Sequence, residues 1–413
     1  MKGDAVTTLS PTTDSRPARR LATVLPAAAL PLLAVLVAAA AVAVHHGTGR
    51  FWGDLAVYRA GAVAAAGGDG ALYDVIHRGT DGIDLGFTYP PFAALLLQPL
   101  AYLDAATGIG LWTLATVAAV AAVVRVTLRA AGADTGPGPV LLGTVAVLPV
   151  FPVAGHLQVG QVGLFLALLV LLDLTGDPDR RWRGLGVGVA AGIKLTPLLF
   201  VVYLLCLRRW RAAGVALAAF AATVGLGLAW RPADSVRFWG GGLFDTARVT
   251  GDPRTVLNQS LHGALARIGD TADVRAVWLP LAALTAVAGL VVAVRCVRAG
   301  HELLGVLAAA TTGLLVSPIS WHHHWIWCVP ALVLLAVRGR RNRYAVAVAV
   351  LLWTALVASA AWTVIGLRGV DLHFRDWQLL HSNLYVLVGY AALGWLAWRP
   401  DGARSDGGEG WHR

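Results

Sequence analysis

Residues Arg50–Pro99 read RFWGDLAVYRAGAVAAAGGDGALYDVIHRGTDGIDLGFTYPPFAALLLQP and begin where the first apolar segment of the chain ends. Aromatic side chains lie around the carboxylate Asp54 in this sequence: Phe51, Trp52 and Tyr58. We expect short amphipathic helices here, broken at Gly67-Gly68 and around Gly79–Gly82. The stretch returns to apolar sequence through Tyr89-Pro90-Pro91, so it marks a border between hydrocarbon and water.

The chain around this stretch has the composition of a membrane protein. Of its 413 residues, 57% are hydrophobic and only 14% are charged, whereas a soluble domain is about 25% charged. Its apolar runs repeat along the whole length, many near the roughly 20 residues that span a bilayer. A transmembrane barrel would instead show alternating segments of about ten residues. The sequence therefore predicts an all-α integral membrane protein, a polytopic bundle of about 10–12 transmembrane helices.

The charges and cysteines exclude other classes. The formal net charge is +10, but the arginines cluster between apolar runs, which indicates membrane topology rather than a nucleic-acid partner. The three cysteines, Cys206, Cys296 and Cys328, are odd in number and far apart, so neither a disulfide framework nor a zinc site is indicated.

The arginine clusters also predict the organisation of the chain. We expect a disordered cytoplasmic tail over 1–20, one transmembrane domain over 21–399 with an external catalytic loop at 45–90, and a second cytoplasmic tail over 400–413. The expected spans are 21–44, 107–131, 138–154, 157–174, 212–230, 276–298, 302–318, 325–338, 344–365 and 379–398.

Two further apolar runs, 88–104 and 184–207, leave the topology open. If both cross, there are about twelve spans and two arginine clusters lie outside. If both dip into the membrane and return, there are about ten spans and every arginine cluster lies inside. We prefer the second version, because broken helices at membrane depth are allowed where they line a cavity. Pro197 and Tyr89-Pro90-Pro91 supply the breaks.

Two charged residues are candidates for chemistry. Asp54 by residue type alone is a helix cap or a solvated loop acid, but a partly desolvated carboxylate near Tyr58 would be a better base. Lys194 stands in mid-run, and Lys2 is the only other lysine among 33 basic residues. It could snorkel to the headgroups, yet an ammonium near the bilayer core costs at least about 3 kcal/mol and marks a functional site. A phosphate would supply its counter-charge.

Histidines and amides form the second group of candidates. The run Ser317–Trp327, SPISWHHHWIW, suggests a metal site, but consecutive residues of a helix cannot all face one ion, so we expect no metal. One or two of its histidines could instead bind a sugar hydroxyl or a phosphate oxygen. The amides that we expect beside the cavity, where they suit sugar hydroxyls, are Gln158, Gln161 and Asn258.

No Walker loop, Rossmann fingerprint or Ser-His-Asp signature is present in the sequence. Asp177-Pro178-Asp179 imitates an acidic pair that holds a metal-bound nucleotide sugar, but it lies in an arginine-rich loop expected in the cytoplasm. A soluble nucleotide donor is therefore disfavoured, and we expect no cofactor.

Five motifs occur in order along the chain: GDLAVYRAG…LYD…FTYPPFAALLLQPL, GQVGLFLALLVLLDL, GVAAGIKLTPLLFVVYLLCLRRW, NQSLHG and SPISWHHHW. Together they resemble glycosyltransferase family 87 (GT87), integral-membrane enzymes of the GT-C superfamily, over roughly residues 45–335. The family includes polyprenyl-phosphate-mannose-dependent α-1,2-mannosyltransferases of phosphatidylinositol mannoside and lipomannan synthesis, and an arabinofuranosyltransferase. The resemblance implies a sugar donor on polyprenyl phosphate, a membrane glycolipid acceptor and a catalytic Asp in the first external loop.

The motif positions assign expected roles to individual residues. The resemblance implies that Asp54 is the catalytic base, that Lys194 of K-x-x-P binds the donor phosphate, and that a histidine of the triple run, most simply His322, assists it. The expected substrate-binding residues are Tyr58, Tyr89, Gln158, Gln161, Asn258 and His323. The expected activity is inverting mannose transfer on the outer face of the cell membrane. Arabinose transfer and transport of a lipid-linked sugar are the alternatives, and the oligomeric state is open.

Overall fold

The computed structural model describes residues 29–43, 46, 53–78, 84–242, 252–368, 373–374 and 377–398. Both expected tails, as well as Phe51, Trp52 and Gly79–Gly82, lie outside these ranges. The helices after the apolar helix Ala29–Ala43 are α2 (Gly53–Gly67), α3 (Pro91–Leu97), η1 (Gln98–Tyr102), α4 (Ala105–Ala130), α5 (Pro137–Val147), α6 (Phe151–Val159), α7 (Gly163–Leu174), α8 (Leu185–Ile193), α9 (Leu198–Cys206), α10 (Trp210–Trp230), α11 (Pro232–Trp239), α12 (Leu261–Ile268), α13 (Arg275–Arg298), α14 (Glu302–Val316), η4 (His322–Trp327), α15 (Cys328–Gly339), α16 (Arg343–Arg368), α17 (Trp377–Ser382) and α18 (Leu384–Trp398).

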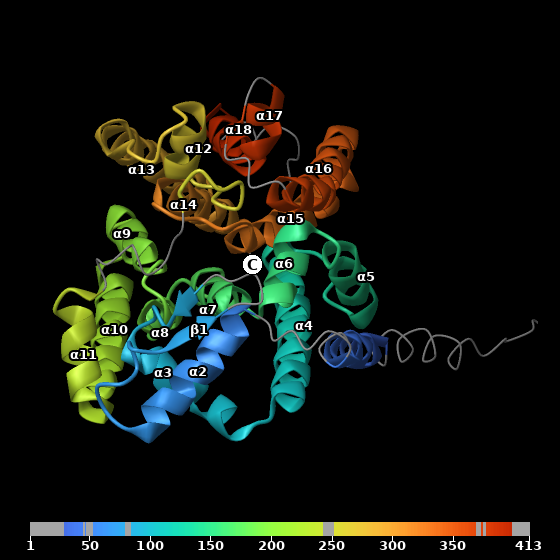
Figure 1. Cartoon of the computed structure of the whole chain (residues 1–413). Coiled ribbons are helices and arrows are strands. Elements are labelled where there is room, and N and C mark those ends of the chain that lie inside the picture. Colours follow the sequence, from blue (N-terminus) through green and yellow to red (C-terminus); the bar gives the residue numbers. More distant parts are fainter. Residues whose placement is uncertain are drawn as a thin grey trace, which may run out of the picture.

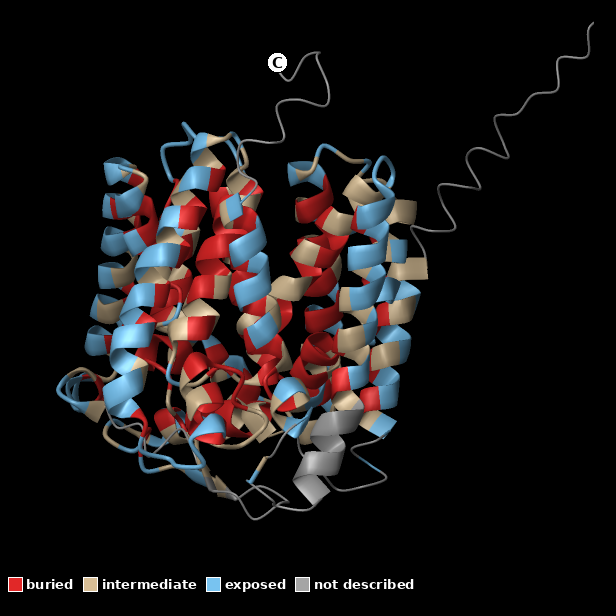
Figure 2. Ribbon diagram, turned by 90° about the horizontal axis from the view of Figure 1, so that it is seen from above, coloured by how far each residue is buried: buried red, intermediate tan, exposed pale blue. Residues whose placement is uncertain are grey.

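The helices form two neighbouring groups, α2 to α11 and α12 to α18, which occupy the lower and upper parts of Figure 1. α6 and α7 of the first group contact η4 of the second. Figure 2 shows the helices side by side, with buried residues facing inward and exposed residues on the outer faces. Many of the exposed residues are large and apolar, among them Leu226, Leu284 and Leu351. Such an outer surface is suited to lipid rather than to water.

Among the described residues, four helices are long and apolar enough to cross a membrane: α4, α10, α13 and residues Arg343–Ala360 of α16. A fifth crossing results if α5 and α6, bent by 82° at a short break, count as one span. The protein is thus an all-α polytopic membrane protein, as the composition predicted. The number of crossings stays a prediction, because several expected spans form helices of only 12–15 residues, such as α7, α14, α15 and α18.

The expected spans 138–154 and 157–174 have the wrong boundaries. Helix α5 ends at Val147, and α6 begins anew with Pro152 in its first turn. A proline lacks the N–H that would continue the earlier helix, and its ring clashes with the carbonyl four residues back. A second break follows at Gly160, where φ is +72°, so α7 begins only at Gly163.

Segment 184–207 is broken at Lys194, as the sequence predicted. Helix α8 ends at Ile193, whose carbonyl would clash with the ring of Pro197, and α9 begins at Leu198. The two ends of the segment meet again: Arg183 Nη2 donates to Glu302 Oε2 (3.0 Å), and Arg209 Nη1 donates to the same oxygen (2.9 Å). The segment therefore turns back on itself, and Lys194 lies at its tip.

Segment 88–104 turns back in the same way. At its start the hydroxyl of Tyr89 lies 2.9 Å from that of Tyr58, and at its end Arg59 Nε donates to the carbonyl of Leu103 (3.0 Å). Tyr58 and Arg59 are neighbours on α2, so the segment begins and ends beside the same turn. α2 itself ends at Gly67, as expected. The sequence did not predict the small antiparallel sheet that follows it, β1 (Ile76–Arg78) paired with β2 (Asp84–Gly86).

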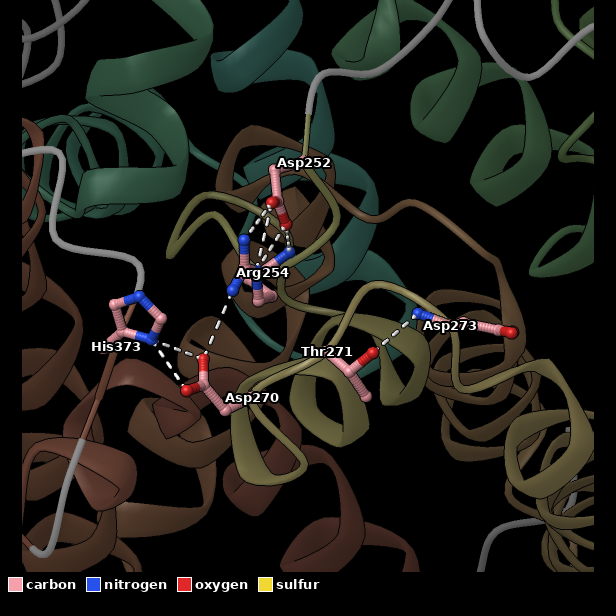
Figure 3. A network of polar contacts seen from close by, with 6 residues as sticks. All are labelled: Asp252, Arg254, Asp270, Thr271, Asp273 and His373. Atoms are coloured by element: carbon pink, nitrogen blue, oxygen red, sulfur yellow. Dashed lines mark hydrogen bonds and ion pairs between the residues drawn. The ribbon is translucent and has the colours of Figure 1, made fainter.

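The polar segment between α11 and α13 is held by an ionic network, shown in Figure 3. Arg254 Nη2 contacts Asp252 (2.6 Å), and its Nη1 contacts Asp270, two residues after α12 (3.3 Å). His373 Nδ1 lies 2.6 Å from the same Asp270 carboxylate. The network links residues 252–254 and 270 to the chain before α17. These groups are partly or largely exposed, so the network fixes loop geometry more than it adds stability.

Candidate active site

Helix α2 brings Asp54 against the break between α6 and α7. Gly160 adopts the left-handed conformation there, and a Cβ on it would lie 2.6 Å from Leu55 Cβ. Only glycine has neither the conformational cost nor the clash at such a position. The close contact packs α2 directly against Gly160, so the partly buried Asp54, next to Leu55, lies beside the α6–α7 break.

Three buried polar side chains form a closed group behind Asp54. Tyr58 Oη donates to Gln161 Oε1 (3.0 Å), Tyr89 Oη lies 3.4 Å from the same oxygen, and the two hydroxyls are 2.9 Å apart. Tyr58 is fully buried, and Gln161 and Tyr89 are almost so. Because both hydroxyls and the amide oxygen have hydrogen-bond partners, these three atoms cost little to bury. The group joins α2, the start of α3 and the α6–α7 break.

Lys194 faces this group from the tip of the α8–α9 segment. Its ammonium nitrogen lies 5.3 Å from the ring centroid of Tyr89, within the range of a cation–π contact. The same nitrogen is 3.2 Å from Nε2 of His324 in η4. Lys194 and Asp54 also interact electrostatically. The structure thus places the acid and the amine, which lie 140 positions apart in the sequence, within range of each other's charge.

An apolar cavity of about 270 Å³ opens at Lys194 and His324. Its walls come from α7, α9, α14 and η4, and most of its lining side chains are apolar. The polar residues at its edge, besides Lys194 and His324, are Thr196, Ser317 and Ser320. A charged amine at one end of an apolar chamber suits a ligand that carries an anionic head on a hydrocarbon chain.

Burial raises the pKa of the Asp54 carboxyl above its ordinary value. The positive charge of Lys194 and a hydrogen bond from the Gln161 side chain act in the opposite direction and keep the increase smaller. Asp54 lies on α2, which is not one of the membrane-spanning helices. A carboxylate in this setting is a stronger base than one in water, and its negative charge is still favoured by the nearby amine.

The three histidines of the triple run lie differently. His322 stacks on Phe151 (ring centroids 4.3 Å apart, 10° between planes) against α6, where Gly155 leaves room for its ring. His323 is buried, and neither of its ring nitrogens has a hydrogen-bond partner among the described residues. Of the three histidines, His324 is the one that contacts Lys194. The reason is the 3₁₀ geometry of η4, with a kink at Trp325, which sends successive rings in different directions.

Asn258 has a structural role that its sequence context did not reveal. The residue is fully buried, and its Oδ1 accepts from Ser320 N (3.1 Å) while its Nδ2 donates to the Pro318 carbonyl (3.2 Å). Its backbone also bridges that of Trp321. These contacts occupy the amide, so Asn258 holds the start of η4 in place instead of facing a ligand.

Gln259 and Gln158 lie outside the group formed by Tyr58, Tyr89 and Gln161. Gln259 Nε2 donates to the Ser382 carbonyl (2.7 Å) and its backbone carbonyl accepts from Trp325 Nε1 (3.1 Å), which couples η4 to α17. No pattern in the sequence predicted this role of Gln259. Gln158 lies exposed on α6, apart from Gln161 and the buried group. Among the described residues, no group of three His, Cys, Asp or Glu side chains is placed to hold a metal ion.

The fold and the comparisons with known proteins together define an integral-membrane glycosyltransferase. The profile described as Glycosyltransferase family 87 matches residues 87–318, and the chain belongs to this family. The chain is 35% identical, over 85% of its length and 86% of the relative's, to a polyprenol-phosphate-mannose-dependent alpha-(1-2)-phosphatidylinositol pentamannoside mannosyltransferase of Mycolicibacterium smegmatis.

A Mycobacterium tuberculosis protein of the same description is also 35% identical, over 83% of this chain and 80% of that relative. A polyprenol-phosphate-mannose-dependent alpha-(1-2)-phosphatidylinositol mannoside mannosyltransferase of Mycobacterium tuberculosis is 35% identical over 82% of this chain and 83% of that relative. No solved structure matches the chain.

Proposed function

We propose that this protein transfers mannose from polyprenyl-phosphate mannose to a hydroxyl of a phosphatidylinositol mannoside or related glycolipid. The observation that carries the proposal is Lys194 in the lining of the apolar cavity, with Asp54 close enough to interact with it electrostatically. The named relatives, which use polyprenol-phosphate mannose and phosphatidylinositol mannosides, support the choice of donor and acceptor.

The reaction is a direct displacement with inversion at the anomeric carbon. The acceptor oxygen attacks that carbon, and Asp54 takes the proton of the acceptor hydroxyl. The bond between the anomeric carbon and the phosphate oxygen breaks, and polyprenyl phosphate leaves with the electron pair. Lys194 stabilises the charge that grows on the phosphate, and His324 replaces His322 as the second ligand. General-base assistance of this type contributes about 10²–10⁴-fold to the rate.

The orientation in the membrane follows from the arginines. Arg183 and Arg209 share Glu302, and Arg211 Nη2 donates to the carbonyls of Asp179 and Arg180 (2.8 and 3.0 Å). These basic loops therefore lie at one end of the bundle, which the positive-inside rule assigns to the cytoplasm. Lys194 lies at the opposite end of α8. We place the site on the external face and both termini in the cytoplasm.

The test is an assay of the purified protein in lipid with labelled polyprenyl-phosphate mannose and phosphatidylinositol mannosides of different size. We expect labelled mannolipid together with an equal amount of free polyprenyl phosphate. Polyprenyl-phosphate arabinose should give no product with the same acceptors. Transfer of arabinose instead would overturn the donor assignment, and movement of intact donor between leaflets without release of polyprenyl phosphate would indicate a transporter.

A further inference from the structure

Helix α18 lies beyond the residues that match the family profile, and it packs on α13 and α14 in the upper helix group of Figure 1. The proposed reaction gives this helix no role. Its inner face nevertheless meets η4, the segment that carries His324, and the two elements are in contact through the indole of Trp325. Trp325 directly follows His324 in the sequence, so the place of its indole bears on the direction of the histidine ring.

The indole of Trp325 has contacts at both ends. At one end its Nε1 donates to the backbone carbonyl of Gln259 (3.1 Å). At the other end its six-membered ring lies against Gly389 of α18, where a Cβ would come within 2.9 Å of Cη2 and 3.3 Å of Cζ3. The ring of Tyr385, one turn earlier on α18, has its centroid 5.6 Å away. Trp325 is only 6% exposed, so a shift of the indole requires these neighbours to move.

Gln259 makes a second link between α18 and η4. Its Oε1 accepts from the backbone N–H of Tyr385 (3.3 Å) and its Nε2 donates to the Ser382 carbonyl (2.7 Å), so the side chain is fixed to the start of α18. Its backbone N–H donates to the carbonyl of Ser320, shortly before η4 (2.7 Å). The start of α18 therefore determines where Gln259 presents the carbonyl that receives the N–H of Trp325.

The backbone of η4 changes direction at Trp325. Its φ of −77° and ψ of 20° are not helical, although the residue lies inside the 3₁₀ segment. A side chain fixed at such a kink restricts the rotation of the residue before it, and that residue is His324, whose Nε2 lies 3.2 Å from the Lys194 ammonium. Both His324 and Lys194 line the apolar cavity. A shift of the indole would therefore disturb the pair that the proposed function assigns to the donor phosphate.

We propose that Trp325 is a positioning residue for His324, and that α18 is part of the scaffold of the phosphate site. Gly389 leaves space for the indole, and Tyr385 and Gln259 fix its place. The inference rests on the proposed function, since α18 acts on the donor only through residues that would bind its phosphate. It gives α18 a role in donor binding without contact between this helix and the substrate.

The experiment compares Gly389→Ala with Gly394→Ala on the same helix. No atom lies within 4 Å of a Cβ on Gly394, whereas a Cβ on Gly389 meets the indole of Trp325 and, at 3.2 Å, Cδ2 of Leu315. Alanine favours a helix over glycine at both positions, so a difference between the variants reports the contacts of the new methyl group. We expect Gly389→Ala to raise the donor KM about 3–30-fold and Gly394→Ala to match the wild type. The measurement is initial rate against polyprenyl-phosphate-mannose concentration at saturating phosphatidylinositol mannoside.

Trp325→Phe shows whether the indole carries the effect. The smaller ring has neither the Nε1 donor nor the Cη2 and Cζ3 atoms, so this substitution should raise the donor KM by itself, and Gly389→Ala should add nothing in its presence. The matched control is Trp353→Phe on α16, which removes an indole N–H that donates to the Ala146 carbonyl (2.7 Å) and should leave the donor KM unchanged. Trp325→Phe inserts no atom into the core, so it carries the test if Gly389→Ala does not give a monodisperse protein.

A double-mutant cycle separates positioning from a general loss of structure. If α18 acts through His324, Gly389→Ala should raise the donor KM in the wild-type background but not in His324→Ala. A packing role alone would lower the midpoint of thermal unfolding and leave the donor KM unmoved. The inference is overturned by a wild-type donor KM in folded Gly389→Ala or in Trp325→Phe. It is equally overturned by an increase that is as large in His324→Ala as in the wild type.

The outcome is separate from that of the proposed function. If Lys194→Ala and His324→Ala keep the wild-type donor KM, the phosphate site fails and this inference with it. If both raise the donor KM while Gly389→Ala and Gly394→Ala behave alike, the proposed function stands and only the role of α18 is lost.

Discussion

The ammonium nitrogen of Lys194 lies 3.2 Å from Nε2 of His324, although 130 residues separate them in the chain. A lysine ammonium only donates hydrogen bonds, so Nε2 accepts and the ring proton of His324 sits on Nδ1. Both residues line the apolar cavity. They form a pair that a phosphate oxygen can join, because the ammonium has donors left over for a second acceptor.

Removal of the amine should weaken donor binding. We expect Lys194→Ala to raise the KM for the polyprenyl-phosphate donor roughly 10–100-fold, the range for loss of a charged hydrogen bond. Lys194→Arg keeps the charge and should raise it less. The measurement is initial rate against donor concentration at saturating acceptor. Equal donor affinity in all three proteins would remove Lys194 from the phosphate site.

Substitutions of His324 and His322 should have different effects on the donor KM, because the two side chains have different contacts. His324→Ala removes the partner of Lys194 and should raise the donor KM, while His322→Ala removes a ring stacked on Phe151 and should change it little. The same donor titration checks both variants, with a thermal-unfolding midpoint to show that each is folded. A large effect of His322→Ala on the donor KM, with none from His324→Ala, would show that His322 is the histidine that assists phosphate binding.

Replacement of the base should separate binding from turnover. Asp54→Asn is nearly isosteric and keeps the side chain in reach of Gln161, but it cannot take a proton. We expect folding and donor affinity close to the wild type and a loss of about 10²–10⁴-fold in kcat. Donor binding measured directly, alongside single-turnover rates, distinguishes this outcome from a simple loss of substrate.

The pH dependence should report the burial of Asp54. The base acts when deprotonated, and its pKa is raised by desolvation. Activity should therefore fall as the pH decreases through a value above that of an ordinary aspartate, which is about 3.9. A pH–kcat profile of the wild type measures this limb. In Asp54→Asn the residual kcat should not show this fall at low pH. If the variant shows the same fall as the wild type, the titration belongs to another group.

The sequence predicted the broken α8–α9 segment that carries Lys194, because the signals for it are local in the sequence. Proline at 197 and the mid-run Lys194 predicted a broken helix with an amine at its tip, and the arginine pattern predicted that the segment turns back. The role of Asn258 could not be predicted in this way. An amide looks the same in a sequence whether it faces a sugar or a carbonyl, and only the fold brings Pro318 and Ser320 to it.

The same limit applies to the histidine run. Which ring faces Lys194 depends on the rotation of η4, and that rotation is set by contacts with segments far away, such as the backbone bridge between Asn258 and Trp321. The short helices of the first half were also not predicted. Hydropathy shows where apolar residues are, but not where Gly160 allows the chain to turn.

Loss of the Glu302 carboxylate, which Arg183 and Arg209 share, should destabilise the fold. Arg183 is only 2% exposed, and Glu302 is the acidic side chain that it contacts. Glu302→Gln should lower the midpoint of thermal unfolding by several degrees, because Arg183 is left buried without its counter-charge. The control is Asp74→Asn, which breaks the exposed pair with Arg237 and should leave the midpoint unchanged. Equal midpoints for both variants would show that Glu302 does not hold the α8–α9 segment.

Gly160 should tolerate no side chain, and its replacement tests whether the approach of α2 matters for catalysis. Gly160→Ala places a Cβ 2.6 Å from Leu55 Cβ at a left-handed φ of +72°, a conformation that costs an alanine about 1–2 kcal/mol. α2 must move away, and Asp54 moves with it. We expect kcat to fall about 100-fold, as for a displacement of about 1 Å, with donor KM nearly unchanged because Lys194 and His324 are on other elements.

Gly214→Ala, on α10 where no atom lies within 4 Å of the new Cβ, is the matched control and should be fully active. Wild-type turnover in Gly160→Ala would mean that the reaction does not depend on the contact between α2 and the α6–α7 break.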